Sequence, residues 1–189
     1  MNRICVFCGA ALGARREFAQ AATALGRLMA DRGLGLVYGG TRIGLMGQLA
    51  DAVLDAGGEV IGVLPRTLME REIAHGGLTK LHVVDSLAER KQLMHDLCDA
   101  FAALPGGLGT LDELSEMLTW AQLGIHQKPL GLLNVASYFD GLLAFLRHAV
   151  REGLVRQAHL DLVKVATTPQ ELLWTLAGGA AAGSRAQIR

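Results

Sequence analysis

The sequence is poor in aromatic residues and has no excess of either charge. Aromatic side chains make up 5% of the 189 residues, which argues against a stacking surface for single-stranded nucleic acid. Lys plus Arg equals Asp plus Glu, at 18 each, so the positive excess typical of a nucleic-acid binder is absent. We therefore expect no nucleic-acid partner.

Long apolar runs and cysteines are also scarce. No stretch reaches the roughly 20 apolar residues that a membrane helix needs, and the beginning, MNRICVFCG, lacks the apolar length of a secretory signal. The three cysteines are odd in number, and two of them fall in one apolar segment. These features predict a reduced, cytoplasmic compartment and no membrane partner.

Hydrophobic residues make up 51% of the chain, as short apolar runs that alternate with amphipathic stretches. The runs predict strands and the stretches predict helices. Because the strands are apolar on both faces, they indicate an α/β fold with a mostly parallel sheet covered by helices on both sides. We expect strands at 4–8, 36–38, 60–64, 81–84, 100–104, 130–133 and 162–165, and helices at 15–31, 45–56, 87–97, 111–123, 138–151 and 169–176.

A single domain is expected over residues 1–177, because the length suits one domain and no linker or repeat interrupts the pattern. Residues 178–189 are rich in Gly, Ala and Ser and are predicted to form a flexible tail. Cys5-x-x-Cys8 lies inside a predicted strand, which favours core packing over metal binding. The histidines lack metal-binding spacing, so no metal site is expected.

Ligands of parallel sheets bind at the carboxyl ends of the strands, so the loops there are the candidates for a site. The strongest is PGGLGTLDE at 105–113, which lies between a predicted strand and a helix. Its glycines can bring N–H groups close to an anion, and a helix N-terminus adds about half a positive charge, which suits phosphate. The Lys of a nucleoside-triphosphate loop is missing. Alternatively, Thr110 and Glu113 form only a capping box.

Two further glycine loops follow predicted strands. One is YGGTRIGLMG at 38–47, and the other begins at Gly9 after the first strand. Each could be a simple turn, but several such turns at one edge of a small sheet favour a shared ligand. They are therefore candidate phosphate or base loops, and the residues concerned are Gly9, Gly39, Gly40, Gly44 and Met46.

Arg90 lies on the apolar face of a helix that the sequence predicts to begin near Ser86, within a capping box that ends at Glu89. A charge on that face requires a partner or a ligand, unless the side chain extends out to water. Arg90 and Glu113 begin successive helices and so belong to the same edge. Glu72 could reach a sugar or lie on the surface, and Thr119 could line a pocket or pack.

These residues resemble the LOG ("Lonely guy") family of cytokinin-riboside 5′-monophosphate phosphoribohydrolases, long labelled possible lysine decarboxylases. The similarity covers nearly the whole chain to about residue 176. Thr41, Ala10, Ala11 and Leu87-Ala88 depart from the family pattern near the pocket, which bears on base preference. The matching motifs are P-G-G-x-G-T-x-x-E at 105–113, R-K-x-x-M at 90–94, C-V-F-C-G at 5–9, and T-W-A-Q-L-G at 119–124, with Y-G-G-G-x-x-G-L-M-G matched except at Thr41.

The resemblance implies a Rossmann-like three-layer sandwich, a homodimer or larger homo-oligomer, and hydrolysis of a nucleoside 5′-monophosphate to free base and ribose 5-phosphate without a cofactor. The base would be N6-modified adenine or adenine itself. Arg90 and Glu113 match the catalytic pair. The substrate-binding positions match Glu72, Arg90, Lys91, Gly106, Gly107, Leu108, Gly109, Thr110, Leu111, Asp112 and Thr119.

The sequence bears on two other functions. Amino-acid decarboxylation needs a lysine in a pyridoxal phosphate pocket, and none of the four lysines has a convincing setting. A nucleotide-binding carrier or sensor of Rossmann-like fold is the stronger rival, because a fold does not determine a function. The Arg90–Glu113 pair distinguishes them, since a pure binder does not require it.

Overall fold

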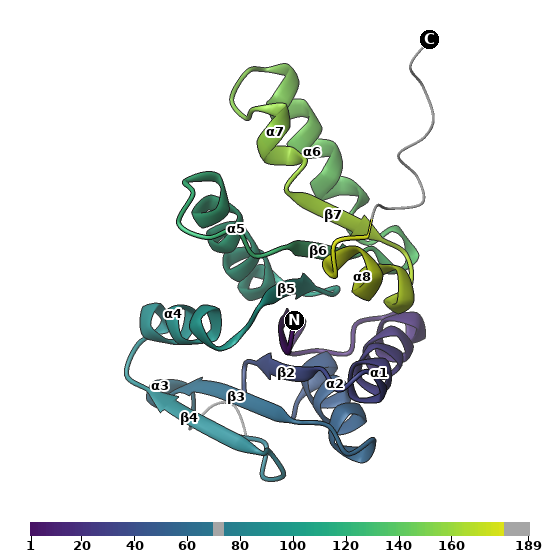
Figure 1. The fold of residues 1–189 in the computed structure, drawn as a ribbon, viewed down its shortest axis with the longest axis vertical. Helices are drawn as coiled ribbons and strands as arrows, with labels where there is room; N and C mark the ends of the chain where they lie inside the picture. Colours follow the sequence, from purple (N-terminus) through teal and green to yellow (C-terminus); the bar gives the residue numbers. More distant parts are fainter. Residues whose placement is uncertain (70–73, 180–189) are drawn as a thin grey trace.

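The computed structural model describes residues 1–69 and 74–179 (Figure 1). Its centre is a seven-stranded sheet in the order β4-β3-β2-β1-β5-β6-β7, and every neighbouring pair is parallel. The predicted α/β fold is thereby confirmed. The strands are β1 Arg3–Phe7, β2 Gly35–Tyr38, β3 Val60–Pro65, β4 Lys80–Val84, β5 Ala100–Ala103, β6 Leu130–Leu133 and β7 Val163–Ala166.

Helices cover both faces of the sheet. Figure 1 shows α4 and α5 on one side and α1, α2 and α8 on the other, in three layers. No helix within residues 1–69 and 74–179 has the length and apolar character to cross a membrane. The helices are α1 Arg16–Asp31, α2 Gly44–Asp55, α3 Arg66–Met69, α4 Leu87–Leu97, α5 Leu108–Gln122, η1 Val135–Ser137, α6 Asp140–Arg151, α7 Gln157–Leu160 and α8 Pro169–Leu176.

Successive residues of β1 enter opposite cores, because side chains alternate along a strand. Ile4 packs in the core under α1 and α2, whereas Cys5 packs in the core under α4 and α5. Cys8 joins the first core, and both cysteines are buried and free. Burial raises the pKa of each of these two thiols. The prediction that the Cys5–Cys8 pair is core packing is confirmed.

The predicted strands and long helices are present, with shifted ends. The capping box at the start of α4 is confirmed, because the Ser86 hydroxyl accepts a hydrogen bond from the Glu89 N–H at 3.0 Å. The short helices α3 and α7 were not predicted, and the helix expected from 138 begins at Asp140, after η1. Most of the predicted tail falls on 180–189, outside the described residues.

The start of α5 differs from the prediction. The helix begins at Leu108, three residues before the expected 111, and its N-cap is Gly107, which makes no side-chain cap. Thr110 is buried inside the first turn and Glu113 lies in the second. A capping box requires its Thr at the helix end, so the alternative that Thr110 and Glu113 merely cap this helix is wrong.

The order of the strands locates a crevice. From β1 the chain moves outward through β2, β3 and β4, and then returns to place β5 on the other side of β1. Where the strand order reverses, the loops that follow the two adjacent strands run in opposite directions. A crevice therefore opens at the carboxyl ends of β1 and β5. The two loops are tied together at its base, where the Gly9 N–H donates to the Pro105 carbonyl at 3.0 Å.

Candidate functional site

A cavity of about 630 Å³ lies at this edge of the sheet. The loops after β1 and β5 form most of its lining, and α2, α4 and α5 each contribute side chains. Ala10 and Ala11, two departures from the family pattern, are part of the wall. The predicted site residues that line the cavity are Gly9, Met46, Arg90, Gly106, Gly107, Leu108, Gly109, Thr110 and Glu113.

Other predicted residues lie around the cavity without lining it in the single chain. Gly39 of the second glycine loop lies against Arg90, and Gly44 lies against Ala10. The rest that the structure describes, apart from Gly40, belong to α4 and α5. Glu72 lies outside the described residues. The residues that do not line the cavity are Gly39, Gly40, Gly44, Lys91, Leu111, Asp112 and Thr119.

Arg90 is turned into the protein. It is 9% exposed, and its Nε donates to the Val63 carbonyl at 3.0 Å while Nη2 donates to the Gly39 carbonyl at 3.2 Å. The two carbonyls offset part of the cost of burying the charge. The alternative that Arg90 extends out to water is therefore wrong.

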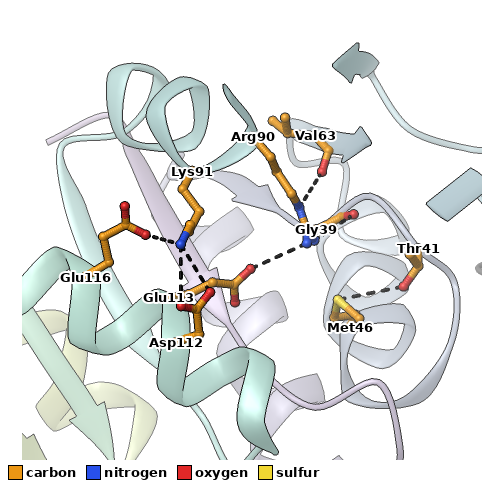
Figure 2. Close-up of polar contacts among 9 residues, drawn as sticks. All are labelled: Gly39, Thr41, Met46, Val63, Arg90, Lys91, Asp112, Glu113 and Glu116. Atoms are coloured by element: carbon orange, nitrogen blue, oxygen red, sulfur yellow. Dashed lines mark hydrogen bonds and ion pairs between the residues drawn. The ribbon is translucent and has the colours of Figure 1, made fainter. Parts of the chain in front are cut away.

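Arg90 and Glu113 face each other in the wall of the cavity (Figure 2). Arg90 Nη1 and Glu113 Oε1 are 3.7 Å apart, and the two side chains are only 10% and 13% exposed. An ion pair sheltered from water interacts more strongly than one on the surface. The structure thus brings together the two charged residues that the sequence singled out.

The loop after β5 presents backbone donors to the cavity. The first intrahelical bond of α5 joins the Leu111 N–H to the Gly107 carbonyl, so the N–H groups of the preceding helical residues have no partner within the helix. Gly106 is tightly packed, since a Cβ there would lie 2.7 Å from Thr110 Cβ and 2.9 Å from the Gly9 nitrogen. This loop can bind an anion through its backbone.

The second glycine loop supports Arg90 and Met46. Gly40 and Gly44 adopt left-handed φ of 81° and 58°, which side chains disfavour. A Cβ on Gly39 would lie 2.9 Å from Met46 Sδ and within reach of the Arg90 guanidinium. Thr41 is fully buried, and its hydroxyl lies 3.7 Å from Met46 Sδ. This loop therefore positions side chains of the cavity wall, and its own glycines do not line the cavity.

Lys91 points to carboxylates of α5 (Figure 2). Its Nζ lies 3.2 Å from Asp112 Oδ2 and also pairs closely with Glu116. Burial opposes the charged form, but the hydrogen bonds that Lys91 donates to Glu116 and Asp112 outweigh this effect, and the pKa of Lys91 is raised. Thr119 is exposed and donates to the Ser115 carbonyl at 2.8 Å.

Sequence reasoning did not identify two aromatic residues of the lining, Phe18 and Tyr138. The Tyr138 hydroxyl donates to the Gly106 carbonyl at 2.5 Å. Tyr138 follows β6 and Phe18 lies in the first turn of α1, after β1. The rule that ligands meet the loops after parallel strands could have pointed to both.

A family model and two plant enzymes match most of this chain in sequence. A family model described as possible lysine decarboxylase matches residues 46–176. The rice (Oryza sativa subsp. japonica) cytokinin riboside 5′-monophosphate phosphoribohydrolase LOG is 48% identical over 175 residues, which are 93% of this chain and 72% of the rice protein. The Arabidopsis thaliana enzyme LOG3, of the same description, is 47% identical over 172 residues, which are 91% and 80% of the two chains.

Solved structures share the fold at lower identity. A molybdenum cofactor binding protein from Rippkaea orientalis is 24% identical, with a TM-score of 0.69 over 94% of this chain and 96% of that one. The molybdenum cofactor carrier protein of Chlamydomonas reinhardtii is 21% identical, with a TM-score of 0.70 over the same shares. These neighbours support the Rossmann-like architecture alone. The family match and the plant relatives show that the chain belongs to the LOG family, which the matching model describes as possible lysine decarboxylases.

Proposed function

We propose that this chain is a hydrolase that cleaves the N-glycosidic bond of N6-modified adenosine 5′-monophosphates, or of AMP, to free base and ribose 5-phosphate. The rice and Arabidopsis relatives carry the name of this activity at 48% and 47% identity. The single observation that supports it best is the sheltered Arg90–Glu113 pair, which shares one cavity with a backbone anion loop.

The 5′-phosphate binds to the loop at residues 106–110. Its negative charge meets the N-terminus of α5, a helix of 15 residues, and the N–H groups of the first turn. The phosphate takes no part in the bond cleavage, so its binding energy serves to position the ribose. A nucleoside without phosphate is therefore a poor substrate.

Glu113 and Arg90 act on the glycosidic bond. As the bond to the base breaks, its electron pair leaves with the base and positive charge builds on the sugar, which an ionised Glu113 stabilises. Glu113 also accepts a proton from the attacking water, whose oxygen bonds to C1′, and the base gains a proton overall. Arg90, held by the carbonyls of Val63 and Gly39, orients Glu113 and the substrate.

The proposed active form of the chain is a homodimer. Leu87, Leu123 and Ile125 are 55%, 66% and 59% exposed on or next to α4 and α5, and the chain has no net charge to oppose association. A second copy on this surface would lie beside Lys91 and Thr119, whose proposed role in binding substrate depends on it. Light scattering should give twice the chain mass for the native protein and a monomer for Leu123→Glu. A native monomer at all concentrations would contradict the dimer.

Other predicted residues keep proposed roles. Asp112, Leu111 and Glu72 remain candidate substrate contacts, and the second glycine loop with Met46 and Gly9 remains a candidate base loop. A cytoplasmic location fits the three free cysteines.

Base release is the direct test of this function. The purified chain is incubated with AMP or N6-isopentenyl-AMP, and the products are separated by chromatography. We expect free base and ribose 5-phosphate, with kcat/KM at least about 10²-fold lower for adenosine than for AMP, because the phosphate contacts are lost. Equal values for the two would refute the phosphate's role. Binding without base release would favour a nucleotide carrier.

The decarboxylase description is tested separately. None of Lys80, Lys91, Lys128 and Lys164 lines the cavity. A Schiff base between pyridoxal phosphate and a lysine therefore has no residue there to form it. An absorbance band from bound pyridoxal phosphate together with release of carbon dioxide from lysine would contradict the hydrolase proposal.

A further inference from the structure

The turn before Tyr138 has an unfavourable backbone. Ala136 and Ser137 adopt left-handed φ of 49° and 60°, and no other non-glycine residue within 1–69 and 74–179 has a positive φ. Such conformations persist where the surrounding structure imposes them, and they cluster at functional sites. Here they lead directly to a side chain that lines the cavity.

Asn134 holds this turn at both ends. Its N–H donates to the Ala166 carbonyl of β7 at 2.8 Å, which anchors it to the sheet. Its Oδ1 accepts from the Phe139 N–H at 2.7 Å, and its Nδ2 donates to Asp140 Oδ1 at 2.7 Å. The turn is therefore fixed from β6 to the start of α6, and Tyr138 lies between these anchors.

The ring of Tyr138 is held as firmly as its backbone. It meets Phe18 edge-on at 5.4 Å between centroids and Phe139 edge-on at 5.1 Å. Both of these neighbours are buried, whereas Tyr138 is 43% exposed. Edge-to-face contacts of this kind fix the orientation of a ring. The hydroxyl is thereby aimed at one acceptor, the Gly106 carbonyl, at 2.5 Å.

The bond to Gly106 acts on the anion loop. The peptide between Gly106 and Gly107 is planar, so a hydrogen bond to its oxygen also fixes the direction of the Gly107 N–H. A hydrogen bond to the Gly106 carbonyl also polarises the Gly107 N–H of the same peptide, which makes this N–H a better donor. Both residues are glycines, whose backbone is otherwise the least restrained of any residue. Gly107 is the N-cap of α5.

We propose that Tyr138 is a positioning residue, which orients the peptide between Gly106 and Gly107 so that the loop binds the 5′-phosphate of the substrate. This inference rests on the proposed function for the identity of the anion. It assigns Tyr138 to phosphate binding, distinct from the action of Glu113 on the glycosidic bond.

Tyr138→Phe tests the inference, because it removes the hydroxyl and keeps the ring. We expect KM for AMP to rise about tenfold with kcat within about twofold, while kcat/KM for adenosine is unchanged, because adenosine has no phosphate for the loop to bind. An unchanged KM for AMP, or an equal loss for AMP and adenosine, would overturn the role. The second outcome would indicate a merely structural hydroxyl.

Ser137→Gly is the matched control. Glycine adopts the left-handed turn readily and leaves the Tyr138 hydroxyl in place, so KM for AMP should stay within about twofold of the native value. A rise as large as that of Tyr138→Phe would assign the effect to the turn and overturn the role of the hydroxyl. Thermal unfolding of both variants verifies that they are folded.

A binding measurement separates this inference from the proposed hydrolysis. The dissociation constant of AMP is measured by calorimetry for Glu113→Gln and for Glu113→Gln with Tyr138→Phe, neither of which requires turnover. About tenfold weaker binding in the double variant supports the role of Tyr138, and equal binding overturns it. If the native chain binds AMP but releases no base, the proposed function fails while this comparison still decides the role of Tyr138.

Discussion

Arg90 shows how one residue can serve both the fold and the site. Its guanidinium donates to carbonyls at β3 and after β2, and faces the carboxylate of Glu113 on α5. The planar fork of a guanidinium can meet several acceptors at fixed angles, whereas an ammonium on a flexible stem cannot. The helical spacing predicts that Arg90 lies on the apolar face but leaves open that its side chain extends out to water. Its acceptors are backbone carbonyls, which no side-chain pattern reveals.

Arg90→Lys should therefore separate charge from geometry. We expect base release to fall at least about 10²-fold and the free energy of unfolding to fall by about 2 kcal/mol, because buried carbonyls lose their donors. Chromatography of the products and urea denaturation measure the two effects. Arg147→Lys, on the exposed surface of α6, is the matched control and should change neither. Native turnover by Arg90→Lys would argue against the geometric role.

The position at which α5 begins determines which residues of the glycine loop line the cavity. The sequence correctly predicts a glycine loop between a strand and a helix, but it begins the helix too late, since a Thr and a Glu three residues apart resemble a capping box. Thr110 is instead buried and packs against Gly106, which itself lies against the loop of Gly9. Contacts between segments that are distant in sequence override a local pattern of this kind.

Two glycines of this loop should respond in opposite ways to the same methyl group. Gly106→Ala forces a Cβ against Thr110 and Gly9, and we expect it to lower the free energy of unfolding by about 1–3 kcal/mol. Gly109→Ala adds a Cβ that meets nothing within 4 Å, and should raise it by about 0.5–1 kcal/mol. Urea denaturation compares the two. Equal effects would mean that Gly106 is not tightly packed.

The strands were predicted well because buried parallel strands are continuous apolar runs, a signal that is local. The short helices α3 and α7 carry no such periodicity. The sequence predicts a helix from Tyr138 but not the left-handed turn before it, because neither Ala136 nor Ser137 is a residue type that favours a positive φ. Its conformation is set by Asn134 and β7, and therefore appears only in the folded chain.

On the scale of the whole molecule, the strand order assembles the site. Gly9, Arg90 and Glu113 are far apart in sequence and meet because β5 lies beside β1. The rule for parallel sheets predicted this edge but not which side chains turn into it. Lys91 follows Arg90 directly, yet it points to Asp112 and Glu116. Adjacent helical residues face different directions, which a motif does not encode.

The stability of the whole molecule should depend on His126. Burial lowers the pKa of His126 below the usual 6.5, although the hydrogen bond between Nε2 and the Met117 carbonyl, at 3.0 Å, opposes this shift. Nδ1 accepts a hydrogen bond from the Lys128 N–H at 3.1 Å. A group whose folded pKa is lowered contributes stability above its unfolded pKa, which is lost as pH falls through the folded value. His95 and Lys128 add further repulsion of the charged form.

Unfolding by urea should therefore require less denaturant at pH 5.5 than at pH 7.5. His82, whose pKa is also lowered by burial, contributes in the same direction. Glu59 and Asp99, with pKa values lowered from 4.5 and 3.8, act only at lower pH. His126→Gln should reduce the difference between the two pH values. An unchanged difference would show that His126 is not responsible.

The most direct test of the proposed site is a crystal structure of Glu113→Gln soaked with AMP, since this variant should bind the nucleotide without cleaving it. We expect the phosphate on the backbone of residues 107–110, and the bond between ribose and base beside Arg90 and position 113. A nucleotide bound elsewhere, or with its phosphate away from this loop, would contradict the assignment of the site.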